Sequence, residues 1–508
     1  MRNISQDPDD ISSNEGKIVM FKNKSSQFYQ TQVTDNKISR NQSIKKIMNL
    51  KKYFLASLIA LGFIACSNND IEDAEGGEPE GTPTYINLSV SLPKGSTKAL
   101  PGDYNPDGDY EGNDGIQTLD VYMIGADKTV EAKRFSGTDL SASGTVVSPS
   151  QPFRTTSGTK VVYVVLNSPN PLGTTAPLDN DLLPIAGLAQ IKTVSGVDYD
   201  VIAMTGKSSP TFIEPDVTVQ DVTSGTNRIS VQAERIASRV IVTTSASTDL
   251  LDDNGVKIGT ISNITYSVAQ GTNKVYFLLQ SNYVTWGTAY VPALGTYSTD
   301  APQYYDYADL KTPTTVPAKP TAGDGYKSLP GKFLFENTHT EGDVKTSHYK
   351  KGNTAYVLVR AKFTPLASAI TDGGALTNGT FYVGETDGKI YSTKAAAQAA
   401  VQNQKVALYE GGKMLQYAWL NPDNITKPLN SPVIRNNIYH INISAFKKIG
   451  YNWNPLVPGT DNPDPKPGNP DEPETPIDPL DPLSPEQTYM TVDISILDWT
   501  IHSYDIEL

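Results

Sequence analysis

Cysteine and histidine are nearly absent from this chain. Cys66 is the one cysteine among 508 residues, and there are four histidines. A framework of disulfide bonds is therefore impossible. Zinc sites and cysteine–histidine catalytic pairs also lack the residues to build them. The histidines, none of which stands in an H-E-x-x-H pattern, are His339, His348, His440 and His502.

The common catalytic and phosphate-binding motifs are missing as well. The sequence has no G-x-S-x-G elbow and no G-x-G-x-x-G that opens a helix. Gly206-Lys207-Ser208 is similar to the end of a phosphate-binding loop, but Val201 stands where that loop requires its first glycine. We therefore expect no enzymatic activity, no cofactor and no metal, apart from one weak calcium candidate described below.

Positive charge and helix-forming runs are also in short supply. The net charge of −13 argues against nucleic acid or an anionic membrane surface as a partner. Glycine (39), proline (35) and tyrosine (27) are plentiful instead, and 38% of the residues are hydrophobic. This composition predicts an all-β protein with sizeable cores, and the length allows two or three domains.

Apolar residues alternate in many short segments, as in half-buried strands. We expect one β domain over residues 99–250 and a second over 251–450, separated by a turn at Asp252–Gly255. Segment 159–166 is almost continuously apolar, so it should be central in its sheet. One alanine-rich helix is expected at 393–404. The other expected strands are 84–92, 119–124, 201–204, 229–233, 238–244, 258–269, 353–363, 414–420 and 437–444.

A short positive segment and a mostly apolar run of thirteen residues, Tyr53 to Ala65, precede Cys66. The apolar run is too short for a comfortable transmembrane helix. Residues 48–65 resemble a bacterial lipoprotein signal peptide, with Cys66 as the lipidated first residue of the exported protein. The alternative is a buried cysteine in an apolar helix. Because a secretory signal should be terminal, we expect Met48 to be the true start and residues 1–47 not to belong to the protein.

The end of the chain is a strand behind a proline-rich tether, residues 451–485. Eleven prolines between 455 and 485 favour polyproline II, which would span roughly 90 Å. The last segment, 486–508, alternates like 84–92 and has no neighbour in sequence to pair with. Two interchangeable strands suggest exchange between copies of the chain. The alternative is a tether that folds back and returns the strand to its own sheet.

The residues expected to carry this exchange are mostly apolar. After Ile496 the apolar phase changes, which implies a bulge or a change of partner. An exposed loop follows the first strand, and a cut between Lys98 and Ala99 would detach that strand as part of a propeptide, residues 66–98. The displaced strand would contribute Ile86, Leu88, Val90 and Leu92, and the donor strand Met490, Val492, Ile494, Ile496, Leu497, Trp499 and Ile501.

Two weaker candidates remain. An acidic loop fits the D-x-N-x-D-G spacing of a calcium loop but has no flanking helices, and its residues are also ordinary turn formers. A tyrosine cluster could serve a monomeric surface lipoprotein as a platform for glycans, although such tyrosines more often pack. The calcium candidates are Asp103, Asn105, Asp107, Asp109 and Asp114, and the tyrosines are Tyr304, Tyr305 and Tyr307.

Several longer motifs resemble the type V pilin, or fimbrillin, family of Bacteroidales, whose members include the subunits of the short (minor) fimbriae of Porphyromonas. The likeness covers most of the chain from Met48 onward. The motifs are Asn353–Pro365, Tyr417–Pro422, Asn430–His440, Asn452–Pro458 and Trp499–Tyr504.

The resemblance implies two β-sandwich-like (transthyretin-like) domains in tandem, followed by a tethered C-terminal donor strand. It also implies export as a lipoprotein to the outer membrane, proteolytic removal of the first strand, and assembly with identical subunits. Accessory and anchor fimbrial proteins would be further partners, with host or bacterial surface receptors for adhesion and biofilm formation. In the family the cut follows an arginine. Lys98 matches that position here, so a trypsin-like or lysine-tolerant protease is expected.

Overall fold

The computed structural model describes most of the chain from residue 81 onward. The chain divides into Met1–Gly77 and Glu78–Leu508, and the description that follows concerns the second part. For residues 109–111, 303–305, 491, 493–500 and 503–505 only the backbone is described. The described residues are 81–92, 109–111, 113–170, 173, 175–287, 303–305, 310–321, 329–339, 348–423, 428–457, 462–467, 478–483, 490–500 and 503–505.

Several predicted features fall outside these ranges. They include the signal peptide with Cys66, the cleavage site at Lys98 and Ala99, and Tyr307. Three of the calcium candidates, Asp103, Asn105 and Asp107, also lie outside the described residues, as do Ile501 and His502.

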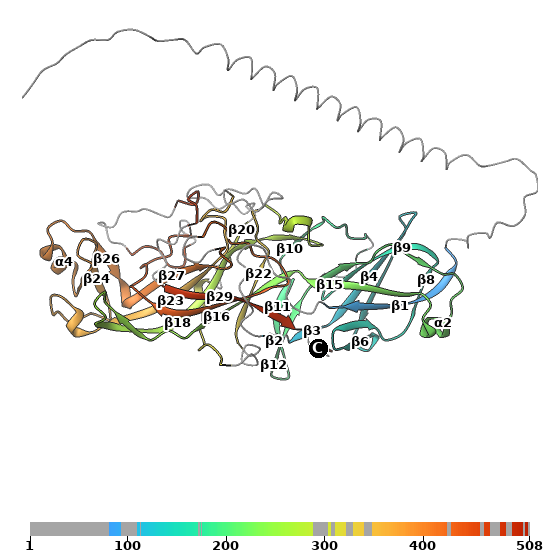
Figure 1. Ribbon diagram of the computed structural model, residues 1–508, viewed down its shortest axis with the longest axis horizontal. Helices are drawn as coiled ribbons and strands as arrows, with labels where there is room; N and C mark the ends of the chain where they lie inside the picture. The colour runs from blue at the N-terminus through green and yellow to red at the C-terminus, as the bar shows by residue number, and fades with distance from the viewer. Residues whose placement is uncertain are drawn as a thin grey trace, which may run out of the picture. The chain divides into compact units, whose positions relative to one another are not determined.

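The described chain is an all-β protein, as predicted, and its amino-terminal half forms one ten-stranded sheet (Figure 1). The segment predicted to be central, 159–166, is indeed internal in this sheet, because it pairs with neighbouring strands along both of its edges. In order, the sheet contains β5 (Val130–Ser136), β4 (Thr118–Gly125), β9 (Gly158–Leu166), β13 (Met204–Lys207), β15 (Arg228–Arg235), β1 (Pro83–Ser91), β7 (Val146–Pro149) and β6 (Leu140–Ser143), with β14 (Thr211–Ile213) beside β9 and β8 (Phe153–Thr156) beside β1.

The carboxyl-terminal half packs two further sheets against each other. Their facing side chains form one buried core, in which Val240 and Ile441 from one sheet join Val357 and Phe363 from the other. The first of these sheets contains β2 (Asp109–Glu111), β29 (Met490–Thr500), β28 (Ile438–Phe446), β16 (Ala237–Thr244) and β22 (Gly331–Phe335). The second contains β17 (Asp249–Leu251), β18 (Lys257–Thr272), β23 (Tyr356–Pro365) and β27 (Lys413–Trp419), with β20 (Gln303–Tyr305) and β21 (Thr314–Thr315) beside β18.

Smaller elements complete the fold. Helix α4 (Lys394–Ala400) begins as predicted, with the Thr393 hydroxyl accepting from the Ala396 amide at 3.1 Å, but it ends at Ala400. The side-chain amide of Gln404 donates to the carbonyl of Ala397 at the end of the helix. The remaining elements are β3 (Asp114–Ile116), β10 (Leu182–Pro184), β11 (Ala189–Val194), β12 (Val197–Ile202), α2 (Val219–Ser224), β19 (Lys274–Tyr276), β24 (Phe381–Gly384), β25 (Ile390–Tyr391), β26 (Val406–Tyr409), β30 (Ser503–Asp505) and short 3-10 turns.

Two predicted strands differ in the structure. Segment 201–204 was expected to be one strand, but Ala203 separates β12 from β13, which belong to different sheets. The backbone of Ala203 instead bonds to Leu188 and Ile236. Segment 238–244 was expected to complete the first domain, but as β16 it pairs with β22 and β28 of the carboxyl-terminal half.

The chain crosses between the two halves through one almost continuous extended segment. Strand β15 ends at Arg235, and β16 starts at Ala237 after the buried Ile236. Buried arginines flank this crossing. Arg235 donates to both carboxylate oxygens of Asp114 at 3.0 and 2.6 Å, and both side chains are fully buried.

Two more arginine–carboxylate pairs lie close to this crossing in the fold. Arg239 bonds to Asp200, and Arg435 forms a two-bond pair with Glu336 at 2.7 and 2.6 Å. Arg235 also donates to the side chain of Asn436, so the crossing is linked to the loop before β28. Burial raises the pKa of Asp114, and the facing Arg235 guanidinium opposes that rise.

We predict that Arg235→Met lowers the free energy of unfolding by about 3–5 kcal/mol, because it leaves the Asp114 carboxylate buried without a partner. The control Arg228→Met removes an arginine with exposed surroundings and should change stability by less than about 1 kcal/mol. Urea titration of both variants measures the difference. Equal small effects would show that the buried pair does not stabilise the crossing.

A second polar network holds β8, one of the neighbours of β1. Glu131 accepts from the hydroxyls of Thr155 and Thr156 at 3.0 and 2.6 Å and from the ammonium of Lys160. Partial burial works to raise the pKa of Glu131, but the donors Lys160, Thr156 and Thr155 outweigh it and hold this pKa below its ordinary value. The charged carboxylate therefore stabilises the folded state.

Because the folded-state pKa of Glu131 is lowered, its contribution should be fully present above the unfolded pKa and lost as the pH falls through the folded one. We predict that Glu131→Gln lowers the free energy of unfolding by about 2 kcal/mol at pH 7. The difference from the wild type should shrink below about pH 4.5. Asp139→Asn, at an exposed turn, is the matched control. A difference that does not vary with pH would refute the ionic role.

Candidate strand-exchange site

Strand β1 lies in the interior of the ten-stranded sheet. It runs parallel to β15 and antiparallel to β7 and β8, so backbone partners lie on both of its edges. Its alternate side chains Ile86, Leu88 and Val90 are fully buried, and Leu92 is 3% exposed. The predicted apolar face is therefore confirmed, whereas displacement of this strand remains a prediction.

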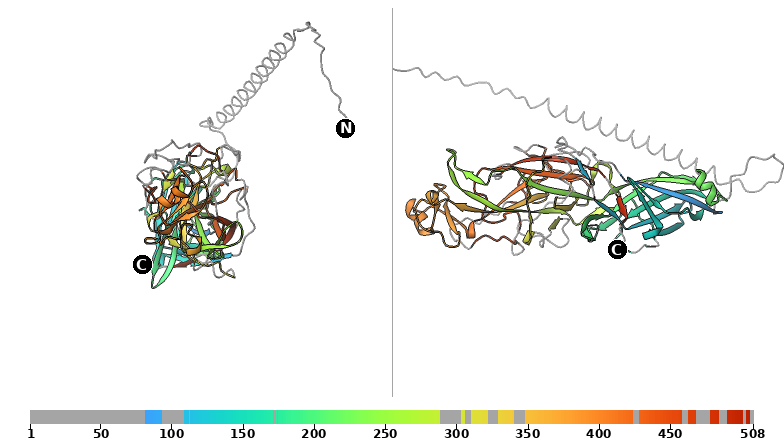
Figure 2. Two further views of the ribbon diagram at one scale, coloured as in Figure 1. Left: turned by 90° about the vertical axis from the view of Figure 1, so that its left-hand side faces the viewer. Right: turned by 90° about the horizontal axis from the view of Figure 1, so that it is seen from below.

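The start of β1 is fixed by polar contacts from the loop around α2. The backbone amide of Tyr85 donates to the carbonyl of Val217 at 3.1 Å, and the side-chain amide of Asn227 donates to the carbonyl of Tyr85 at 3.0 Å. The Thr84 hydroxyl donates to the carbonyl of Glu214 at 2.8 Å. Figure 2 shows β1, in blue, and helix α2 at the same end of the sheet from another side. These contacts hold β1 in register with β15.

The tail strand β29, red in Figure 1, lies within the five-stranded sheet of its own chain. It pairs antiparallel with β28 along eight residue pairs, and Met490 and Val492 are buried in the core between the two carboxyl-terminal sheets. The alternative in which the tail returns to its own sheet is therefore the arrangement seen here. An open edge of β28 explains it, since this edge would otherwise expose unpaired backbone groups.

The tail changes partner where the sequence predicts a change. Up to Leu497 it pairs with β28, and from Asp498 to Thr500 it pairs in parallel with β2. A last short strand, β30, then pairs in parallel with β3. The phase change after Ile496 thus coincides with a change of neighbours, although these neighbours belong to the same chain.

The described parts of the tether are packed on the body of the chain, so a free extended tether is a wrong expectation for them. Leu456, Val457 and Leu483 are buried in a cluster with strands β23 and β27. Asp464 forms ion pairs with Arg360 and Lys413. Proline favours an extended backbone, but these apolar and charged side chains attach that backbone to the sheet.

One of the five possible ligands in the weak calcium candidate already has another partner. Asp114 uses both carboxylate oxygens to bind Arg235. The backbone of Asp109 belongs to β2, which pairs with the tail. In the part of the chain that the structure describes, no group of three or more His, Cys, Asp or Glu side chains could hold a metal ion.

For the tyrosine cluster and the histidines, the described residues show partners within the fold. The backbone of Tyr304 and Tyr305 belongs to β20, which pairs with β18. His440 is buried on β28 with its ring nitrogen 2.8 Å from the Thr243 hydroxyl, and His339 is buried against the carbonyl of Asn353. Among the described residues, no helix has the length and apolar character needed to cross a membrane.

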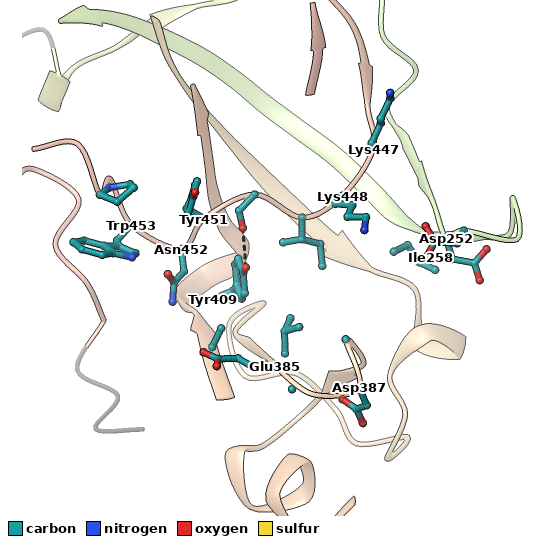
Figure 3. A pocket seen from close by; sticks show the side chains of 18 of the residues that line it. Asp252, Ile258, Glu385, Asp387, Tyr409, Lys447, Lys448, Tyr451, Asn452 and Trp453 are labelled. Carbon is teal, nitrogen blue, oxygen red and sulfur yellow. Dashed lines mark hydrogen bonds between the residues drawn. The ribbon is translucent and has the colours of Figure 1, made fainter. Parts of the chain in front are cut away.

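A cavity of about 740 Å³ lies beside the start of the tether (Figure 3). Its wall carries charges of both signs, including Glu385 and Lys448, and the aromatic rings of Tyr451 and Trp453. The Tyr409 hydroxyl donates to the carbonyl of Gly450 at 2.7 Å and fixes the loop that forms one side. No residue singled out from the sequence as a site lines this cavity.

Sequence reasoning missed the buried arginines and the tether contacts. Arg235 and Asp114 are 121 residues apart, and Arg360 and Asp464 are 104 residues apart. No local pattern marks such pairs. A usable signal would have been an arginine in the apolar phase of an alternating strand, as at Arg235 in β15, or within a mostly apolar strand, as at Arg360 in β23.

Comparison with known proteins identifies the relatives of this chain. Residues 407–505 match the family described as major fimbrial subunit protein type IV, fimbrillin, C-terminal. The chain is 33% identical over 515 residues to the minor fimbrium subunit Mfa1 of Porphyromonas gingivalis, covering 91% of this chain and all of that protein.

Solved structures of fimbrial proteins are also similar. The fimbrilin FimA of Porphyromonas gingivalis W83 matches with a TM-score of 0.40 and 15% identity, over 82% of this chain and 98% of that one. The tip fimbrial protein Mfa3 of the same species matches with a TM-score of 0.33 and 11% identity, over 82% of this chain and all of that one. On the strength of 33% sequence identity over 91% of its length, this chain belongs to the fimbrillin family, together with the minor fimbrium subunits of Porphyromonas gingivalis.

Proposed function

We propose that this chain is a structural subunit of a surface fimbrium and that it polymerises by exchanging strands. A protease cuts between Lys98 and Ala99, β1 leaves its sheet, and the tail strand of another copy takes its place. The observation that carries the proposal is the position of β1. This strand is internal and has an apolar face. The polypeptide chain joins it to the following strands through the segment that contains the cut, so one cut leaves it held by non-covalent contacts alone.

The energetics favour refilling of the site once β1 has gone. Its four inward side chains each contribute roughly 1.5–3 kcal/mol by burial. Without them, β15 on one side and β7 with β8 on the other would present unpaired backbone groups along an apolar groove. Such a groove binds an added strand through main-chain hydrogen bonds, with pockets for alternate side chains.

The tail strand has the properties that this groove requires. Met490 and Val492 occupy alternate positions, like Ile86 and Leu88, and both are buried where the tail lies in its own chain. Donation to a neighbour uses different surfaces on donor and acceptor. A contact of this kind does not close on itself and therefore gives an open filament.

Location and partners follow from this role. The subunit would leave the cell as a lipoprotein attached through Cys66 and reach the surface at the outer membrane. It would then contact identical subunits, accessory and anchor fimbrial proteins, and receptors on host or bacterial cells, supporting adhesion and biofilm formation. The relatives are fimbrial subunits, and we propose that this chain likewise has no enzymatic activity.

A second candidate function is a monomeric surface lipoprotein that binds glycans or host proteins. Two observations favour it: the tail lies in its own sheet, and a cavity with aromatic and charged walls is present. An accessory or tip subunit is a related alternative, since a tip protein is among the similar structures. A subunit of either kind has no need to donate its tail.

We predict that limited trypsin treatment of protein starting at Ser67 yields a new amino terminus at Ala99 and then filaments. Amino-terminal sequencing, gel filtration and electron microscopy follow the reaction. The double variant Lys94→Gln/Lys98→Gln is the matched control, because trypsin could also detach β1 by cutting after Lys94; it should stay uncut in this segment and monomeric. A clean cut at Ala99 with a product that remains monomeric would favour the binding-lipoprotein alternative.

We also predict that deleting residues 488–508 gives a folded monomer that never polymerises alone. The deletion removes the buried Met490 and Val492, at roughly 1.5–3 kcal/mol each, so some loss of stability is expected. Because its groove is intact, the shortened protein should still accept a wild-type tail and shorten wild-type filaments when mixed in. Filaments of the shortened protein alone would refute the donor role of the tail.

A further inference from the structure

We infer that the tether is held on its own subunit by two anchors of unequal strength, and that release of the weaker one governs whether the tail strand can reach a neighbour. The inference rests on the proposed strand exchange. The root anchor comprises the described residues 454–457 and 462–467, and the distal clip comprises residues 478–483. Both contact the region around β23 and β27.

The outer face of β23 and β27 carries large apolar side chains that the tether covers. Along β23, Val357 and Val359 point into the core, whereas Tyr356 and Leu358 belong to a cluster on the other face. Tyr417 and Trp419 of β27 extend that cluster, and the centroids of their rings are 5.4 Å apart. The tether supplies the apolar side chains that complete it, namely Leu456, Val457 and Leu483. Departure of the whole tether would therefore expose large aromatic side chains to water.

The root anchor is fixed by a shielded ion pair. Arg360 contacts one oxygen of Asp464 through two of its nitrogens at 2.5 Å, and Lys413 lies 3.4 Å from the other oxygen. The side chains of Arg360 and Asp464 are only 12% and 7% exposed. Removing one partner of such a pair leaves a charge without its counterpart in a poorly hydrated place, so the pair should persist.

Buried amides bind the root anchor into a closed loop. Asn462 donates to the carbonyls of Asn454 and Val457 at 2.6 and 3.2 Å. The Asp464 amide donates to the side chain of Asn462 at 2.9 Å, and the Asn454 amide donates to the carbonyl of Asp464 at 3.2 Å. These bonds lie within the tether and join its described residues 454–457 and 462–464. Leu456, Val457 and the ion-paired Asp464 would therefore have to leave the sheet together, which makes the root anchor the stronger of the two.

The distal clip is attached by fewer and more exposed contacts. The amides of Lys351 and Gly352 donate to the carbonyls of Asp481 and Pro479 at 2.9 and 3.0 Å. The ion pair between Lys351 and Asp481 is 3.6 Å long, and the Asp481 side chain is 49% exposed although that of Lys351 is only 7% exposed. Leu480 is also 47% exposed, so Leu483 is the one large apolar side chain of the clip that is buried. A long ion pair with one half-exposed partner is easier to hydrate than the shielded pair of the root anchor, so the clip should open more readily.

The number of residues between each anchor and the tail strand decides how far that strand can reach. From Leu483 to Met490 there are seven residue steps, which span at most about 23 Å. From Pro467 to Met490 there are twenty-three steps, or at most about 75 Å. With the clip closed, β29 is confined near its own β28. With the clip open and the root anchor in place, the same strand can extend beyond its own subunit while remaining attached to it.

Hydrogen exchange of the uncut monomer tests the inequality of the anchors without any polymerisation. We expect the amides of Lys351 and Gly352 to exchange at least a hundredfold faster than those of Asn454 and Asp464. Similar protection at both anchors would overturn the inference. This readout stands even if strand exchange does not occur.

A reversible lock tests the gating role. Lys350 and Pro482 are antiparallel bridge partners, so the variant K350C/P482C in protein starting at Ser67 can form a disulfide across the clip. Oxidised and cut after Lys98, it should stay monomeric, and dithiothreitol should restore filaments at the wild-type rate. Oxidised protein that polymerises as fast as the reduced form would overturn the gate.

A charge reversal provides the opposite perturbation. Asp481→Lys places two like charges at the clip and should speed filament growth of the cut protein about threefold or more. Glu410→Lys, at an exposed turn, is the matched control and should leave the rate unchanged. An unchanged rate for D481K would count against the gate. If cut wild-type protein forms no filaments, strand exchange itself fails, and hydrogen exchange alone then decides whether the anchors differ.

Discussion

Unpaired strand edges are the constraint on which this structure depends. A strand with an open edge leaves backbone donors and acceptors without partners, and an apolar face beside it adds to the demand for cover. At two places in this chain, strands near the two ends of the described residues cover such edges. Strand β1 fills the space between β15 and β7, and the tail strand covers the edge of β28. The proposed assembly moves one segment into the place of the other.

The two places are connected through a rigid crossing. Strands β15 and β16 form one extended path between the halves, and buried arginine–carboxylate pairs such as Arg235 with Asp114 fix its surroundings. Asp114 also starts β3, which pairs with the end of the tail. The proposed donor and acceptor regions of one subunit are thus linked by well-packed structure, and we propose that the tether is the element that changes its contacts.

The sequence predicted the elements better than their partners. Alternation identified β1 and the tail strand, a continuous apolar run identified the internal strand β9, and Thr393 marked the start of α4. Where the tail would lie could not be predicted, because the same apolar side chains satisfy either its own sheet or that of a neighbour. The tether was misjudged because Asp464 meets Arg360 across 104 residues, and proline content says nothing about such a contact.

The central claim is that the tail of one subunit replaces β1 of the next. Electron cryomicroscopy of filaments grown from trypsin-cut protein tests it directly, at a resolution that shows side chains beside β15. The account predicts that residues 490–500 of a neighbouring subunit lie there and that residues 83–91 are gone. Finding residues 83–91 still paired with β15, with each tail on its own β28, would contradict it.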